Sequence, residues 1–206
     1  MNSALAISQL KKLKKLVDKN DLRLAAEGWK NDYEILISTI LSAQTKDETT
    51  IDVCENYLFK KYKNFQELSK AKIKDVEKII RRINYHKTKA RNIIETSKII
   101  ISEFNAKVPE KLDDLLRLKG VGRKVANVYL VEARKADAIG VDTHVARISQ
   151  KLNWTKNKNP HKIEKDLEKL FPKKYWNSIN YILVKFGRTI GKNRKFEDEV
   201  LEKIIK

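Results

Sequence analysis

Apolar side chains recur every three or four positions through most of this chain, a spacing that predicts helices rather than strands. The clearest stripe lies in the stretch from His86 to Phe104. Its members are Ala90, Ile93, Ile94, Ser97, Ile100, Ile101 and Phe104. The stretch from Asp32 to Leu41 is apolar on several sides, which predicts a helix at the centre of a core. The sequence has no comparable alternating pattern, so we expect an all-α fold.

Prolines, glycines and capping residues mark the ends of the other predicted helices. They interrupt the chain rarely, since its 206 residues include only three prolines and six glycines. We expect helices at Asp47–Lys60, Lys74–Ile83, Glu110–Leu118, Arg123–Arg134, Thr143–Leu152 and Pro160–Leu170, and a last long helix over the sequence YWNSINYILVKFG.

Two short segments bear on the domain organisation. The sequence contains no long-period repeat and no Gly/Ser-rich linker, so any division into lobes must be made by packing. The apolar segment ADAIGV (Ala136–Val141) is the best candidate for a crossing point between lobes. The basic run KLNWTKNKN (Lys151–Asn159) is expected to be a solvated loop, with phosphate contact as the alternative.

The charge balance points to a polyanionic partner. The chain has 45 Lys and Arg against 27 Asp and Glu, a formal net charge of +18. Such a surplus favours nucleic acid first and an anionic membrane surface second. It also predicts binding that weakens steeply as salt is added.

The single cysteine and the N-terminus limit the cellular context. Cys54 lies in an apolar run without a partner for a disulfide or a soft-metal site, so we expect it to be a buried small hydrophobe. The opening sequence MNSALAISQLKKLKKL has no apolar core long enough for a signal peptide, and no segment approaches a membrane span. An intracellular, cytoplasmic protein without membrane contact is expected.

The stretch LKGVGRKVANVYL places Gly120 and Gly122 between two predicted helices. Glycine allows positive backbone φ and a close approach to the backbone, and the N-terminus of the following helix is suited to a phosphate oxygen. A dinucleotide fingerprint would need a third glycine where Val125 stands, and a Walker-type loop would need four residues between its glycines. A helix-hairpin-helix against DNA backbone and an ordinary glycine turn remain, and the turn alone does not decide between them.

Lys124 and Asp142 add candidate chemistry. A nucleophilic lysine needs a lowered pKa, and the positive helix end and the neighbouring Arg123 both disfavour the charged form of Lys124. The alternative is a lysine that pairs only with phosphate or solvent. Eighteen positions later, Asp142 is predicted to cap the next helix. The same carboxylate could stabilise positive charge on a sugar or help deprotonate the lysine. His144, just inside that helix, is expected to pack or cap.

With these residues in view, the chain resembles the endonuclease III family of helix-hairpin-helix DNA glycosylases. The resemblance runs from about Asp32 to Arg188. Its motifs, in order along the chain, are LISTILSAQTKD, INYHKTKARNI, LKGVGRKVANV and VDTHVARI. The last two, at this spacing, are the most specific to the family.

The resemblance implies an all-α protein of two lobes. A six-helix barrel lobe near residues 26–135 would carry the helix-hairpin-helix, and a second helical lobe from 1–25 plus 136–206 would carry the catalytic aspartate. Lys124 matches the family's nucleophile and Asp142 its aspartate. By analogy, Lys124 attacks C1′ of a flipped damaged nucleotide, expels the base, forms a Schiff base and cuts the strand by β-elimination. The partner would be double-stranded DNA with damaged bases or abasic sites, bound by a monomer associated with the nucleoid.

The resemblance also implies residues that contact DNA. The hairpin residues Gly120, Val121, Gly122 and Arg123 would face phosphate, and a monovalent cation at the hairpin stays an open option. Gln44 and Tyr85 match positions whose side chains fill the space that a flipped base leaves, where an amide can pair with the orphaned base and a ring can stack. The alternatives are a helix-terminal polar residue for Gln44 and a loop-anchoring aromatic for Tyr85. The family usually has glycine and an aliphatic residue where this chain has Asn84 and Tyr85, which could alter lesion preference.

The C-terminus departs from the family. Most members end in four cysteines, spaced C-x6-C-x2-C-x5-C, that hold an iron-sulfur cluster. Here the first three positions are Gly191, Asp198 and Leu201, and the fourth would fall one residue beyond the end, so we expect no cluster and no metal cofactor. The sequence GKNRK could still present Lys192, Arg194 and Lys195 to DNA without metal.

Three functions are consistent with the sequence. The first is a base-excision-repair glycosylase with abasic-site (AP) lyase activity on oxidised pyrimidines. The second keeps this fold and mechanism but acts on 8-oxoguanine, or on mismatched or uracil bases. The third is a non-catalytic helix-hairpin-helix DNA-binding module, which would leave the match of both Lys124 and Asp142 to the family without explanation.

Overall fold

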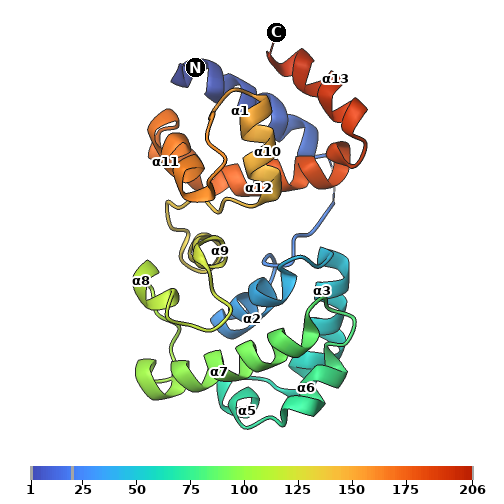
Figure 1. Ribbon diagram of the computed structural model, residues 1–206, viewed down its shortest axis with the longest axis vertical. Helices are drawn as coiled ribbons and strands as arrows, with labels where there is room; N and C mark the ends of the chain where they lie inside the picture. Colours follow the sequence, from blue (N-terminus) through green and yellow to red (C-terminus); the bar gives the residue numbers. More distant parts are fainter. Residues whose placement is uncertain (1, 20, 206) are drawn as a thin grey trace. The chain divides into compact units, whose positions relative to one another are not determined.

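The computed structural model describes residues 2–19 and 21–205, and these residues form helices joined by turns and loops, with no strand among them (Figure 1). The predicted all-α fold is confirmed. The chain divides into two compact units. We call Arg23–Arg134 the central unit, and Met1–Leu22 together with Lys135–Lys206 the terminal unit. None of the helices in the described residues is long and apolar enough to cross a membrane.

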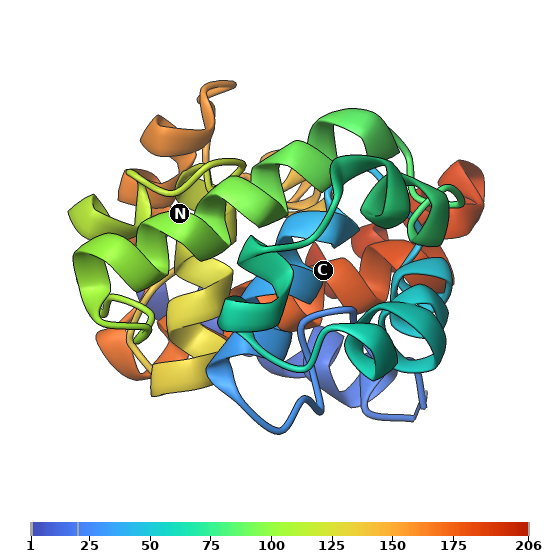
Figure 2. The same ribbon diagram turned by 90° about the horizontal axis from the view of Figure 1, so that it is seen from below.

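The central unit is built around a buried helix. Its elements are α2 (Asp32–Ser42), α3 (Asp47–Val53), the π-helical turn η1 (Cys54–Leu58), α4 (Phe59–Lys61), α5 (Phe65–Ser69), α6 (Ile73–Ile79), α7 (His86–Phe104), α8 (Leu112–Leu115) and α9 (Arg123–Arg134). Most of α2 is buried, as its apolar pattern predicts, and both α7 and α9 pack against it. The long helix α7 also runs across α5 and α6 (Figures 1 and 2).

Opposite charges join the end of α9 to the start of α2. The guanidinium of Arg134 donates to both carboxylate oxygens of Asp32, at 2.9 and 2.5 Å. A cation at a helix C-terminus and an anion at a helix N-terminus each complement the helix dipole. The hydrogen bonds from Arg134 hold the pKa of Asp32 below its usual range. This contact therefore fixes the C-terminal end of α9, the helix that follows the hairpin.

The terminal unit combines the two ends of the chain. Its elements are α1 (Ser3–Val17), α10 (Thr143–Lys151), α11 (Pro160–Leu170), the 3-10 turn η2 (Lys173–Tyr175), α12 (Trp176–Thr189), the 3-10 turn η3 (Ile190–Lys192) and α13 (Arg194–Ile205). Helix α12 packs against α1 and α10, and α13 packs against α1. The indole N–H of Trp154 donates to Gln9 at 2.7 Å, which ties the loop after α10 to the N-terminal helix.

Several predicted boundaries need correction. The helix expected at Glu110–Leu118 is only α8, because tight i,i+3 bonds turn the chain from Asp114 onward. The helix expected at Lys74–Ile83 ends at Ile79. The run Lys151–Asn159 is not simply a solvated loop, because Trp154 and Thr155 are buried in it. Helices α1, α5 and α13 were not predicted, and Cys54 is fully buried as expected.

Candidate active site

The two glycines of the hairpin have different surroundings. Gly120 has φ +79°, and a Cβ there would lie 2.9 Å from the side-chain nitrogen of Asn92 on α7, so the protein itself requires glycine. A Cβ on Gly122 would meet nothing within 4 Å. The carbonyl of Gly122 accepts the N–H of Ala126 at 3.0 Å, which starts α9. Only the second glycine is therefore free of any packing requirement within the protein.

Contacts with the core fix the position of the hairpin. The hydroxyl of Thr96 on α7 donates to the carbonyl of Lys119 at 2.8 Å, and Val121 is buried. Arg123 and Lys124 are half-buried in the first turn of α9, where the helix dipole is positive. Val125 and the residues after it form the buried face. Lys124 is thus held at the start of a well-anchored helix.

The loops that carry Gln44 and Tyr85 are joined to each other in the central unit. Both residues are exposed and have left-handed backbones, with φ +56° and +58°. The side-chain amide of Asn84 donates to the carbonyl of Gln44 at 2.5 Å, and its backbone N–H donates to the hydroxyl of Thr45 at 3.2 Å. Tyr85 then forms the N-cap position of α7, and the residue is 67% exposed.

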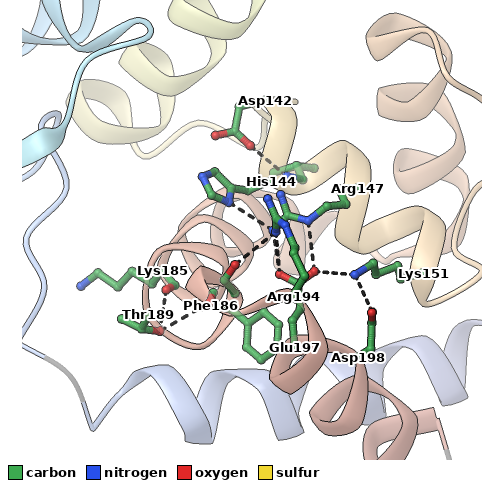
Figure 3. A network of polar contacts seen from close by, with 12 residues as sticks. Asp142, His144, Arg147, Lys151, Lys185, Phe186, Thr189, Arg194, Glu197 and Asp198 are labelled. Carbon is green, nitrogen blue, oxygen red and sulfur yellow. Dashed lines mark hydrogen bonds and ion pairs between the residues drawn. The ribbon is translucent and has the colours of Figure 1, made fainter.

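Asp142 lies in the terminal unit, at the N-cap of α10 as the sequence predicts. Its carboxylate accepts a hydrogen bond of 2.8 Å from the backbone N–H of Val145 (Figure 3). Two residues later, the ring of His144 lies over Gly187 of α12, where any Cβ would overlap it. His144 is therefore a packed residue, as expected. Burial, with Arg147, Arg188 and Arg194 adding to it, lowers the pKa of His144 despite the opposing effect of Asp142.

A buried carboxylate connects α10 to α13. Glu197 is completely buried and accepts hydrogen bonds from Arg147 and Lys151, each at 2.7 Å, and from Arg194 at 3.2 Å (Figure 3). Burial raises the pKa of Glu197, but the hydrogen bonds from Arg147 and Lys151 outweigh it and hold the pKa below its usual range. Lys151 also contacts Asp198 at 2.5 Å. The sequence alone did not indicate this ion cluster.

The residues around Gly191 do not fit an iron-sulfur cluster. A Cβ at Gly191 would collide with the carboxylate of Glu197, so the position has no room even for the first atom of a cysteine side chain. The only cysteine, Cys54, is buried in the central unit. Among the described residues no group of three or more His, Cys, Asp or Glu is arranged to hold a metal ion.

The basic residues of this segment are placed differently from one another. Lys192 lies in η3 and Lys195 in the first turn of α13, and both are exposed. Arg194 instead donates to the carbonyl of Gly191 and to Glu197, both at 3.2 Å. All three residues are therefore exposed, but only Arg194 also takes part in the ion cluster around Glu197.

The comparisons with known proteins agree with this fold and these motifs. Residues 37–173 match the family model of the HhH-GPD superfamily base excision DNA repair protein. The chain therefore belongs to the HhH-GPD superfamily. It is 43% identical to endonuclease III of Thermotoga maritima over 160 residues, which cover 78% of this chain and 75% of the relative.

Solved structures narrow the class further. A trapped endonuclease III–DNA covalent intermediate superposes with a TM-score of 0.86 and 32% identity, over 94% of this chain and 90% of that one. A non-covalent endonuclease III–DNA complex superposes with a TM-score of 0.85 and 33% identity, over 92% and 87%. Within the superfamily, the chain is a member of the endonuclease III family. It is a DNA-binding base-excision glycosylase with AP lyase activity.

Proposed function

We propose that Lys124 is the nucleophile of this enzyme and that Asp142 assists it. The Nζ lone pair of Lys124 attacks C1′ of the flipped nucleotide, the C1′–N bond breaks, and the base leaves with the bonding electrons and a proton. The second amine proton is transferred to O4′ as the C1′–O4′ bond breaks, which opens the sugar ring and gives a Schiff base. Removal of a C2′ proton then breaks the C3′–O bond, and the 3′ phosphate leaves with the bonding electrons. Asp142 stabilises the positive charge that develops on the sugar and helps to take up the proton from the lysine.

The observation that carries this proposal is that two family motifs, the hairpin with Lys124 and the helix start with Asp142, occur together in this chain. Lys124 follows the glycine hairpin at the positive end of α9, and Asp142 caps α10 with one carboxylate oxygen bound to Val145. Both positions match the family motifs on which the resemblance rests. Lys124 belongs to the central unit and Asp142 to the terminal unit.

The hairpin and the two neighbouring loops bind DNA in this proposal. Gly122, whose outer face is open, lets a phosphate reach the start of α9. The side chains of Gln44 and Tyr85 fill the space left by the flipped base. Their contacts offset part of the free energy of unstacking, which is on the order of a few kcal/mol. Lys192 and Lys195 contact the phosphate backbone, and Arg194 holds the segment between them through Glu197.

The proposed substrate is an oxidised pyrimidine in double-stranded DNA. We infer that the enzyme works as a monomer, in the cytoplasm on the cell's own DNA, without an iron-sulfur cluster. Asn84 and Tyr85 stand where the family usually has glycine and an aliphatic residue, and this difference lies beside the inserted side chains. Because of this difference, 8-oxoguanine, or mismatched or uracil bases, form the second candidate class of substrate.

A panel of duplexes tests both the substrate and the residues. Matched oligonucleotides would carry thymine glycol, dihydrouracil, uracil or 8-oxoguanine at one position, and excision and nicking would be followed under single-turnover conditions. We expect thymine glycol, the oxidised pyrimidine, and dihydrouracil, a pyrimidine with the same saturated 5,6 bond, to be excised and nicked fastest, and Lys124→Ala to be inactive on all four. Lys119→Ala removes a neighbouring cation of the hairpin and should still nick. Faster excision of 8-oxoguanine or uracil would replace the proposed substrate class.

A further inference from the structure

Lys89 is a lysine that the fold keeps out of water. It lies in the first turn of α7, on the same face as the buried Ala90 and Ile93, and it is only 7% exposed in a chain of 45 basic residues. An unpaired ammonium is costly to bury, so such a residue must satisfy its donors within the protein. Burial lowers the pKa of Lys89 to about 8, and no carboxylate offsets this effect.

All three donors of this ammonium are directed at one short segment. Nζ lies 2.8 Å from the carbonyl oxygen of Leu41, 2.5 Å from that of Ala43 and 3.2 Å from the hydroxyl of Thr45. Leu41 belongs to the last turn of α2, where carbonyls lack intrahelical partners and the dipole is negative. The cation of α7 therefore caps α2 and also holds the turn that follows it.

Gln44 is an exposed residue whose two neighbours in this turn are both bound by Lys89. Its φ of +56° is uncommon for a residue with a Cβ, and such a backbone persists only where its surroundings hold it. Lys89 binds the residues on both sides of it, and Asn84 binds its own carbonyl. Tyr85, also left-handed, directly precedes the helix that carries Lys89.

We propose that Lys89 is a positioning residue for base flipping: through its bonds to Leu41, Ala43 and Thr45 it clamps the Gln44 loop to the Tyr85 loop, so that both side chains enter the duplex as one unit. This inference rests on the proposed roles of Gln44 and Tyr85. Lys89 itself touches no reacting atom. Its loss should weaken insertion while leaving the chemistry at an already exposed abasic sugar intact.

The direct test is a fluorescence measurement of insertion. The probe is a duplex with 2-aminopurine opposite a tetrahydrofuran abasic analogue, which has no base to excise. Insertion changes the stacking of 2-aminopurine, so saturating enzyme should change its fluorescence. We expect Lys89→Met, which keeps the length of the side chain, to lose most of that change, and its excision of thymine glycol from duplex DNA to fall about tenfold through kcat. Lys98→Met, which removes an exposed lysine from the same helix, should behave like wild type in both assays.

Two further measurements separate positioning from simple stabilisation. Borohydride trapping on a single-stranded abasic oligonucleotide needs no insertion, so Lys89→Met should trap at the wild-type rate. Thr45→Val removes the hydroxyl that accepts from both Lys89 and the backbone N–H of Asn84, while the two carbonyl acceptors of Lys89 remain, and it should show a smaller loss of the fluorescence change. If Lys89→Met does not fold, Thr45→Val decides by itself: a wild-type signal would overturn the clamp.

The clamp and the proposed function fail in different ways. Gln44→Ala and Tyr85→Ala should each reduce the fluorescence change. If they do not, the proposed insertion is wrong and the inference falls with it. If they reduce it while Lys89→Met gives the full wild-type change, the insertion stands and the clamp is overturned.

Discussion

Asp142 accepts a hydrogen bond of 2.8 Å from the backbone N–H of Val145, and this contact makes it the N-cap of α10. A capping aspartate and a catalytic aspartate would look alike in a sequence, but they respond differently to substitution. Asparagine caps a helix about as well as aspartate, whereas alanine does not. The charge and the cap can therefore be removed separately.

The first prediction uses that difference. Asp142→Asn should change the free energy of unfolding by less than about 0.5 kcal/mol, and Asp142→Ala should lower it by about 1 kcal/mol. Both variants should lose excision by about 100-fold or more, because the charge that stabilises the developing cation is gone. Chemical denaturation and single-turnover excision measure the two effects. A fully active Asp142→Asn would reduce Asp142 to a cap.

The second prediction compares the two hairpin glycines. Gly120→Ala should lower the free energy of unfolding by at least about 1 kcal/mol, because φ is +79° and the new Cβ meets Asn92. Gly122→Ala should cost less than that, since its Cβ enters open space, yet it should weaken DNA binding about tenfold by blocking a phosphate contact. Thermal unfolding and a binding titration on an abasic-analogue duplex give both values. Wild-type affinity in Gly122→Ala would contradict the phosphate contact.

The third prediction concerns the buried carboxylate of Glu197. Glu197→Gln leaves Arg147, Lys151 and Arg194 without their shared anion and should lower the free energy of unfolding by on the order of 3 kcal/mol at pH 7. The pKa of Glu197 is lowered in the folded protein from its ordinary value of 4.5. The stabilisation is therefore complete above pH 4.5 and is lost as the pH falls through the folded-state pKa.

Denaturation at a series of pH values checks this sign. The difference in unfolding free energy between wild type and Glu197→Gln should be constant near neutral pH and shrink below the ordinary pKa of a glutamate. Glu199→Gln, an exposed carboxylate two residues away, is the matched control and should change stability little. A difference that grows toward acid pH would contradict the ion cluster as described.

The fourth prediction concerns Lys192 and Lys195. Changing both to glutamine should weaken binding to any duplex. The plot of the logarithm of the association constant against the logarithm of the salt concentration should become less steep, by about 1 for each phosphate contact that is lost. The control is a double variant with Lys98→Gln and Lys203→Gln. It loses the same two positive charges, but from outside this segment. Filter binding between low and moderate salt measures the slope. An unchanged slope in the double variant would remove the C-terminal segment from the DNA interface.

Sequence patterns predict the parts of this fold that local chemistry determines. Helix α7 follows the apolar stripe, α9 begins directly after the second hairpin glycine, and α11 begins at the proline. All three have the bounds that the sequence predicts. Asp142 is the cap that its position before Thr143 predicts. These features depend on neighbours within a few residues, so a single sequence contains enough information to place them.

Lys89 and Glu197 show what local patterns cannot supply. The acceptors of Lys89 are two backbone carbonyls and a hydroxyl from residues 41 to 45, and no sequence motif encodes a contact between a lysine and a distant carbonyl. The cations around Glu197 likewise come from another helix, except for Arg194. One signal for Lys89 was present in the sequence: a lysine on the apolar face of α7, in line with Ile93, is a candidate for burial with a specific partner.

Borohydride trapping tests most directly whether Lys124 forms a Schiff base with the sugar of the damaged nucleotide. Wild-type enzyme, Lys124→Ala and Lys119→Ala would each be incubated with a duplex containing a natural abasic site and then reduced, and the cross-linked peptide would be identified by mass spectrometry. We expect a covalent adduct on Lys124 in wild type and in Lys119→Ala, and none in Lys124→Ala. An adduct of undiminished yield in Lys124→Ala, or one mapped to another residue in wild type, would contradict it.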